Sequence, residues 1–206
     1  MGELVMVDMG ISNLASVAEA FRRIGAGVRV TGDPADVARA RALILPGVGA
    51  FGDGMSALRA KRLDEAVKAH VLERRRPLMG ICLGMQLLTE GSHEHGWHEG
   101  LGLIPGRCVR LAPDDPGLRV PNMGWCDVEV RRPTAFFEQV VDGESFYFAH
   151  SFHVRCDKND VAASFRYGGE VVAALSRDGV CGVQFHPERS QDAGLRVLAG
   201  FVAAAA

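Results

Sequence analysis

The sequence predicts an α/β protein with an open mixed, mainly parallel central sheet flanked by helices. In the first half, short apolar runs alternate with stretches whose apolar residues recur at helical spacing. This alternation is typical of parallel strands joined by crossover helices. Glycine-rich segments follow several of the apolar runs, and beyond Gly100 the pattern becomes mostly β. We therefore expect the strands of the second half to extend the parallel part and to make the sheet mixed.

Elements of the first half begin with a buried strand, followed by a helix that Asn13 is placed to cap and that Gly25 and Gly27 end. In order, the predicted elements are a strand at 4–8, a helix from Asn13 to about Ile24, strands at 28–31 and 42–45, a glycine loop at 46–54, a helix over about 55–75, a strand at 77–81 and a helix after Cys82.

The second half is predicted to consist mostly of strands. Arg177, Asp178 and Gly179 are typical of a hairpin turn between two of them. A final helix is expected from about Gln191 to Ala203. The predicted strands lie at 108–111, 125–130, 145–149, 161–165, 171–175 and 180–185. Without a repeat or a low-complexity linker, residues 1–206 are expected to form one domain.

Composition agrees with a globular enzyme. The chain has 206 residues, 48% of them hydrophobic, and a formal net charge of -2, so it suits one domain with a sizeable core. The basic residues are scattered, which argues against nucleic-acid binding, and no apolar run reaches membrane-spanning length. Five cysteines without paired spacing argue for a reducing compartment, and we expect a cytoplasmic protein.

The segment Gly80 to Gly84 has the pattern Gly-x-Cys-x-Gly directly behind an apolar run. In hydrolases such an elbow turns a strand sharply into a helix and exposes the residue at the bend. Cys82 should therefore face solvent at a helix N-terminus, where unpaired N–H groups and the helix dipole favour the nucleophilic thiolate. The two glycines permit the strained turn.

A second segment, Gln184 to Glu188, supplies a base. In an extended chain His186 and Glu188 point to the same face, and Pro187 keeps His186 out of the helical region. A carboxylate beside an imidazole fixes its tautomer and stabilises the imidazolium. Cys82, His186 and Glu188 are thus the predicted catalytic triad, because both segments fall at the carboxyl ends of predicted strands.

Simpler interpretations exist for these motifs. A cysteine between glycines is often a small buried hydrophobe in a tight turn, and His-Pro-Glu alone fits an ordinary strand end. The densest ligand-like cluster, His93, His95 and His98 with Glu94 and Glu99, matches no zinc spacing. We interpret that cluster as a solvated loop and expect neither a metal nor a cofactor.

An acyl-transfer site also needs N–H donors for the developing oxyanion. The residue after the nucleophile, Leu83, supplies one donor from its backbone. The loop of Gly47, Val48 and Gly49 is the candidate for the other. This loop lacks the Gly-Lys-Ser/Thr ending of a phosphate-binding loop, although it also fits a simple tight turn after a strand.

These motifs, taken together, resemble the class I (triad) glutamine amidotransferases. Within that family the chain is similar to the glutaminase subunits of imidazole glycerol phosphate synthase, mainly through the segments at 82–86 and 121–125. The matching segments span nearly the whole chain in the expected order; they lie at 46–51, 80–88, 121–125, 147–152 and 184–191. The resemblance implies a flavodoxin-like sheet.

The resemblance also implies a reaction and a binding site. Cys82 would attack the carboxamide of glutamine, His186 would pass a proton to the departing ammonia, and water would then cleave the glutamyl thioester. By the same resemblance the glutamine-binding residues would be Gln86, Glu94, Ser151 and Phe152.

A partner follows from the same resemblance: a (β/α)8-barrel cyclase in a heterodimer, which takes the ammonia through an internal channel. The cyclase would make imidazole glycerol phosphate and an aminoimidazole carboxamide ribotide in histidine biosynthesis. Residues expected at this interface by analogy are Asn13, Asn122, Met123, Trp125 and Arg189, although Trp125 also fits a core position.

The chain departs from the family pattern at Met9, Asn122, Cys126 and Phe152, none of which belongs to the triad. Three other functions stay open: the glutaminase subunit of another synthase, such as anthranilate or aminodeoxychorismate synthase, a stand-alone γ-glutamyl hydrolase, and a non-catalytic binding subunit. The segment Met123 to Trp125 argues against the first, and intact triad residues argue against the last.

Overall fold

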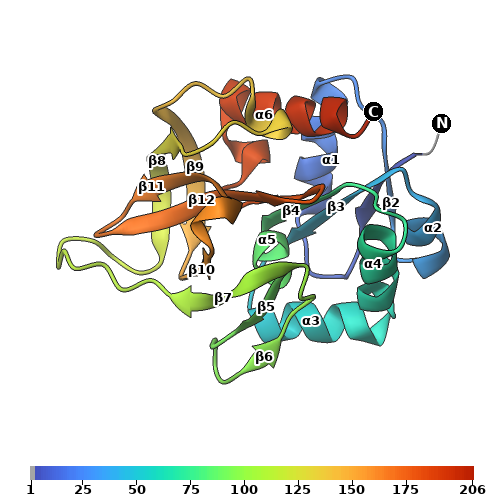
Figure 1. Cartoon of the computed structure of the whole chain (residues 1–206), viewed down its shortest axis with the longest axis horizontal. Coiled ribbons are helices and arrows are strands. Elements are labelled where there is room, and N and C mark those ends of the chain that lie inside the picture. The colour runs from blue at the N-terminus through green and yellow to red at the C-terminus, as the bar shows by residue number, and fades with distance from the viewer. Residues whose placement is uncertain (1–2) are drawn as a thin grey trace.

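A computed structural model describes residues 3–206 (Figure 1). The elements up to residue 99 are β1 (Leu4–Val7), α1 (Leu14–Arg23), β2 (Val28–Thr31), α2 (Pro34–Arg39), β3 (Ala42–Gly47), α3 (Phe51–Ala60), α4 (Leu63–Leu72), β4 (Leu78–Cys82), α5 (Leu83–Leu87), β5 (Thr89–Ser92) and β6 (His98–Glu99). The later elements are β7 (Ile104–Arg110), β8 (Asn122–Val130), β9 (Glu144–His150), β10 (Phe152–Cys156), β11 (Val161–Arg166), β12 (Glu170–Arg177), β13 (Val180–Val183) and α6 (Gln191–Ala204), with short 3-10 turns η1 (Ala135–Phe137), η2 (Lys158–Asp160) and η3 (Pro187–Arg189).

The central sheet has nine strands in the order β2-β1-β3-β4-β13-β12-β11-β8-β9. Its first five strands pair in parallel, in the strand order of flavodoxin-like sheets. The other four pairings are antiparallel. The mixed sheet is confirmed, but the prediction that it is mainly parallel is wrong: parallel and antiparallel pairings are equal in number, because β12, β11, β8 and β9 extend the edge beyond β13 in antiparallel order.

Helices cover both faces of the parallel strands, which explains their continuous apolar sequences. In β1, Leu4 and Met6 pack toward α1 and α6, whereas Val5 and Val7 pack toward α2, α3 and α4. Figure 1 shows α1 and α6 on one side of the sheet and α2, α3 and α4 on the other. A second sheet, in the order β10-β7-β5-β6, lies beside the parallel strands.

The sequence-based prediction of a single helix over 55–75 is wrong. The structure has two helices, α3 and α4, separated at Arg62, whose φ of 56° is left-handed. Helix α3 also begins earlier than expected, at Phe51, and so includes the glycine at 54. That glycine permits close packing, because a Cβ there would meet the Leu83 and Leu87 side chains of α5 at 3.1–3.2 Å and push them aside.

Helix α2 and the second sheet were not predicted. Helix α2 carries a clear start signal, since the Asp33 side chain accepts a hydrogen bond from Ala35 N–H at 2.8 Å and Pro34 is its first residue. Asn13 does occupy the N-cap position of α1, but its side chain makes no capping hydrogen bond. The hairpin turn at Asp178 and Gly179 is confirmed between β12 and β13.

Within residues 3–206, no helix is both long enough and apolar enough to cross a membrane.

Candidate active site

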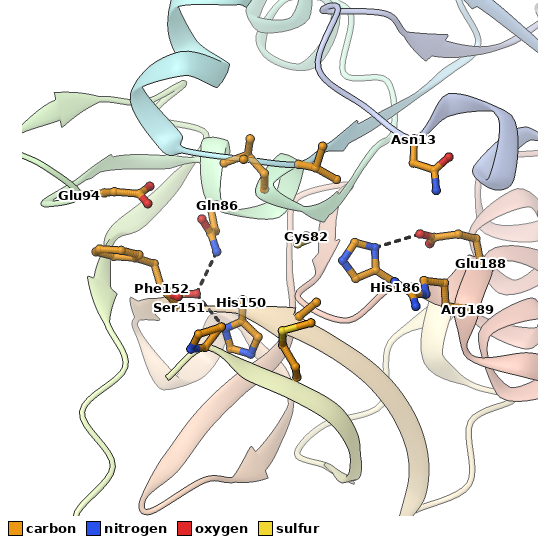
Figure 2. Close-up of a pocket in the computed structure, with 16 residues that line it drawn as sticks. Asn13, Cys82, Gln86, Glu94, His150, Ser151, Phe152, His186, Glu188 and Arg189 are labelled. Carbon is orange, nitrogen blue, oxygen red and sulfur yellow. Dashed lines mark hydrogen bonds and ion pairs between the residues drawn. The ribbon is translucent and has the colours of Figure 1, made fainter. Parts of the chain in front are cut away.

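The predicted site residues gather around one cavity of about 450 Å³ at the carboxyl ends of the parallel strands (Figure 2). Open α/β sheets bind ligands at this edge because the loops leaving neighbouring strands meet there. The lining includes nearly all of the predicted catalytic and substrate-binding residues; they are Cys82, His186, Glu188, Val48, Gly49, Leu83, Gln86, Glu94, Ser151 and Phe152. Gly47 lies beside the cavity without lining it.

The elbow is formed where β4 passes directly into α5. Cys82 has φ 53° and ψ −111°, a conformation that is costly for a residue with a side chain. Close packing enforces it: a Cβ on Gly84 would come within 1.7 Å of the Leu45 backbone oxygen, and one on Gly80 within 2.7 Å of Gly84. Cys82 is only 7% exposed. It therefore faces the cavity rather than open solvent.

His186 follows β13 and lies between Cys82 and Glu188 in Figure 2. Its Nδ1 is 2.9 Å from Glu188 Oε1, so a proton on Nδ1 is held by the carboxylate and Nε2 is left for the thiol. The backbone is anchored as well, because His186 N–H donates to Tyr147 O at 2.9 Å and Ser190 Oγ donates to His186 O at 2.7 Å. The imidazole is thus fixed in position and tautomer.

The charge state of His186 is set by opposing influences. Burial disfavours the imidazolium, but hydrogen bonds with Cys82 and Glu188, together with the negative charges of these two groups, raise the His186 pKa to about 10. The imidazolium is therefore favoured at neutral pH when Cys82 is a thiolate. A thiolate beside an imidazolium is the resting form of an activated cysteine nucleophile.

The backbone donors expected for an oxyanion are not all directed at the cavity. Leu83 is the first residue of α5, and the first N–H groups of a helix lack intrahelical acceptors. Val48 N–H, by contrast, donates to Ile11 O at 3.2 Å. The Val48 N–H of the expected loop is thus occupied in this conformation, and a rotation of the peptide between Gly47 and Val48 is needed to free it.

Gln86 lies one helical turn after Cys82 and is 5% exposed. Its Nε2 donates to Phe152 O at 2.9 Å and to Gln184 Oε1 at 3.1 Å. Since both amide hydrogens are used, its side-chain oxygen is left to accept a hydrogen bond from a ligand. This arrangement suits an ammonium or amide group in the cavity.

Glu94 and Ser151 complete the far side of the cavity. Glu94 Oε2 accepts from Phe51 N–H at 2.7 Å, so the carboxylate caps the first turn of α3. That bond uses one oxygen, and the other remains available to a positively charged ligand. Ser151 connects β9 to β10, Phe152 is the first residue of β10, and both line the cavity.

The predicted interface residues are divided between the cavity rim and the interior. Asn13, Met123 and Arg189 line the cavity, and Met123 and Trp125 are 67% and 49% exposed. Trp125 is therefore not a core residue. Asn122 is only 3% exposed, so its side chain does not reach the surface, and any interface role is indirect. Its Nδ2 lies 3.5 Å from His150 Nε2.

Three residues contribute to the site without having been assigned a role from the sequence. Gln184, fully buried, donates from Nε2 to Cys82 Sγ at 3.8 Å. His150 lines the cavity, and Tyr147 lies 4.1 Å below the Arg189 guanidinium. All three belong to segments that carried the family resemblance, but only three-dimensional pairing shows what they touch.

The histidines at 93, 95 and 98 do not converge. Among residues 3–206, no three His, Cys, Asp or Glu side chains are placed to hold a metal ion. His93 instead packs against Trp97, with ring centroids 4.9 Å apart and the ring planes tilted by 55°, and His98 packs against α3 at Gly52. The five cysteines are all free.

The comparisons with known proteins agree with this architecture. The model of the family "Glutamine amidotransferase class-I" matches residues 5–204. The chain is 48% identical over 203 residues to the imidazole glycerol phosphate synthase subunit HisH of Syntrophotalea carbinolica, covering 96% of this chain and 98% of that protein. It is 41% identical over 199 residues to subunit HisH 1 of Campylobacter jejuni strain RM1221, covering 97% and 98%.

Solved structures extend the similarity to the fold. A structure described as PurLQS from Thermotoga maritima superposes with a TM-score of 0.76 at 23% identity, covering 99% of both chains. A structure described as a glutamine amidotransferase gives a TM-score of 0.78 at 21% identity, again covering 99% of both. At these identities the likeness concerns the fold alone.

Proposed function

The chain belongs to the class I glutamine amidotransferases and is the glutaminase subunit of an imidazole glycerol phosphate synthase in histidine biosynthesis, and from this we propose that Cys82, His186 and Glu188 carry out its reaction. The observation that supports this assignment is the placement of His186 between the other two residues, with Nδ1 2.9 Å from Glu188. The substrate is glutamine, bound in the cavity of about 450 Å³.

The first half-reaction forms a thioester. The Cys82 thiolate attacks the side-chain carbonyl carbon of glutamine, and backbone N–H groups stabilise the oxyanion of the tetrahedral intermediate. As the intermediate collapses, the carbon–nitrogen bond breaks and His186 donates a proton to the departing nitrogen, so ammonia leaves. Glu188 stabilises the imidazolium before the transfer and keeps the ring oriented afterwards.

The second half-reaction releases glutamate. His186, now neutral, takes a proton from water as the water attacks the thioester carbonyl, and the carbon–sulfur bond then breaks. The thiolate and imidazolium are regenerated together. Throughout, the Gln86 oxygen and Glu94 are placed to hold the amino end of glutamine, with Ser151 and Phe152 beside them.

We further propose that full activity is conditional. The Val48 N–H bond to Ile11 O leaves the oxyanion with an incomplete set of donors, and losing one such donor costs about 10²–10³ in rate. A partner that rotates this peptide supplies the missing donor. A stand-alone hydrolase would instead need both donors in place, so the arrangement favours a regulated subunit.

The proposed partner is the (β/α)8-barrel cyclase of the synthase, in a heterodimer through which ammonia passes. Supporting this surface, Met123 is exposed in the cavity lining, and Trp125 is exposed two residues farther along β8. Exposed aromatic and arginine side chains such as Arg189 are typical anchors of interfaces. We infer a cytoplasmic location, which five free cysteines support.

The test is glutamate release from glutamine by the chain alone and then with the cyclase subunit and its ribonucleotide ligand. Low activity alone that rises strongly in the complex is expected. Full activity alone, unchanged by the cyclase, would contradict the conditional scheme. The Cys82→Ala variant is expected to lose glutaminase activity in both conditions, by about 10³-fold or more.

A further inference from the structure

We infer that Gln184 is a positioning residue for the nucleophile: its side-chain amide holds Cys82 and joins it to the substrate-binding Gln86. The inference rests on the proposed function, in which Cys82 is the attacking group. Gln184 follows β13 and is fully buried. Its backbone N–H donates to Ala173 O at 2.8 Å, so its place relative to the sheet is fixed.

The two ends of the Gln184 amide make different contacts. Its Nε2 lies 3.8 Å from Cys82 Sγ, and its Oε1 accepts a hydrogen bond from Gln86 Nε2 at 3.1 Å. Since Gln86 can only donate from its nitrogen, the oxygen of Gln184 must face Gln86. The NH₂ group of Gln184 must therefore face the sulfur, which accepts most strongly as a thiolate.

The chain of hydrogen bonds continues beyond Gln86. Gln86 Nε2 also donates to Phe152 O at 2.9 Å, and His150 Nδ1 lies 2.9 Å from the same oxygen. Burial of His150 lowers its pKa to about 4, so the ring is neutral and, bonded in this way, donates from Nδ1. In this series of hydrogen bonds, each N–H group can point only toward its own acceptor. This arrangement fixes the rotamers of both glutamines.

Two consequences follow for the reaction. The thiolate receives a donor that does not change its protonation state during turnover, unlike His186. At the same time the Gln86 oxygen is turned toward the cavity, because both of its amide hydrogens are used. Gln184 therefore couples the position of the nucleophile to that of the substrate-binding group.

Gln184→Met tests this inference, since methionine has a similar length but cannot donate a hydrogen bond and accepts one only weakly. We expect the pH at which Cys82 reaches half of its maximal alkylation rate by iodoacetamide to move upward, as followed by mass spectrometry of the Cys82 peptide. In the complex with the cyclase subunit, kcat should fall by about 10- to 100-fold, the range that corresponds to a hydrogen bond to a charged group. Besides Cys82, the titratable side chains lining the cavity are Glu94, His150, His186, Glu188 and Arg189, and none of them is altered.

Val183→Ala is the matched control. Val183 is the last residue of β13 and directly precedes Gln184, and its truncation removes buried volume without changing a polar group. It should lower the melting temperature but leave the alkylation profile unchanged. If Gln184→Met does not fold, Gln184→Leu, which is also uncharged and without a donor, takes its place with the same expected shift.

An alkylation profile and a kcat equal to those of the parent would overturn the role of Gln184. That failure is distinguishable from failure of the proposed function: an active Cys82→Ala variant would refute the nucleophile itself. An inactive Cys82→Ala with a normal Gln184→Met would refute only this inference.

Discussion

His186 gains its basicity from two neighbours that lie on opposite sides of its ring. Burial favours the neutral imidazole, and only the hydrogen bonds and negative charges of Cys82 and Glu188 bring its pKa up to about 10. The charge on His186 is therefore a property of the assembled triad. A change in either neighbour should be visible in the titration of the ring.

Cys82→Ala should lower the pKa of His186, because the variant removes the thiolate's hydrogen bond and charge while burial still disfavours the imidazolium. The measurement is the pH dependence of the His186 ring signals by NMR, in the parent and the variant. Cys181→Ala is the control, since this buried cysteine lies outside the cavity lining. An unchanged His186 titration would contradict the ion pair.

The triad residues were predictable from sequence because each lies in a short segment with its own local signature. Gln184 was not predictable in the same way, although it stands two residues before His186. Its contacts to Cys82 and Gln86 span 102 and 98 residues of sequence. Such pairings arise only when β13 takes its place beside β4.

At the scale of elements, the elbow depends on the close approach of α5 to β3. A Cβ on Gly84 would come within 1.7 Å of the Leu45 backbone oxygen, and a backbone atom cannot move aside as a flexible side chain can. The fit between these two elements therefore holds the strained Cys82 in place.

Gly84→Ala should destabilise the chain by roughly 1–3 kcal/mol or more, the usual cost of overpacking, and should also reduce glutaminase activity by displacing the elbow. Urea unfolding and glutamate release measure the two effects. Gly27→Ala serves as the control, because a Cβ there meets nothing within 4 Å and Gly27 has no positive φ. A Gly84→Ala protein as stable and active as the control would contradict this account of the elbow.

The oxyanion loop between β3 and α3 should change its hydrogen bonding when the synthase assembles. In the free chain Val48 N–H is bonded to Ile11 O, so its exchange with solvent deuterium should be slowed. Binding of the cyclase subunit with its ribonucleotide should turn this N–H toward the cavity. We expect a changed Val48 amide chemical shift and faster exchange by NMR; an amide unaffected by the cyclase would contradict a regulated loop.

Element boundaries were predicted best where a single physical signal dominates. Buried parallel strands are short, apolar and bounded by glycine, and β1, β3, β4 and β13 were all found. The break between α3 and α4 depends on a left-handed Arg62, for which no residue in that stretch is a marker. Helix α2 is only six residues long, too short for helical periodicity to be seen.

At the scale of the whole molecule, three buried histidines make stability depend on pH. Burial is the main cause that lowers the pKa of His70, His150 and His153 to about 4 in each case. In the unfolded chain their pKa is near 6.5, so unfolding takes up protons between these two values. Their contribution to stability is full above about pH 6.5 and is lost as the pH falls toward 4.

The free energy of unfolding should therefore decrease as the pH is lowered from 7 to 4.5, by on the order of 1 kcal/mol or more for each of the three histidines. Urea titrations at several pH values provide the measurement. A His70→Asn variant, which lies away from the cavity, should show a shallower dependence than the parent. Equal slopes in the two proteins would contradict this assignment.

The organisation of residues 1–206 as one domain remains a prediction. Strands β1 and β13 lie in the same sheet, and α1 contacts α6 near the other end of the chain. We therefore expect one cooperative unfolding transition, with coincident curves by circular dichroism and tryptophan fluorescence. Two separated transitions would contradict a single domain.

The central claim is that glutamine hydrolysis passes through a thioester on Cys82. The most direct measurement is an acid quench of the assembled synthase during turnover of glutamine, followed by mass spectrometry of the Cys82 peptide. The account predicts a γ-glutamyl adduct on Cys82 that hydroxylamine removes and that Cys82→Ala lacks. Continued glutamate release with no adduct, or with the adduct on another residue, would contradict it.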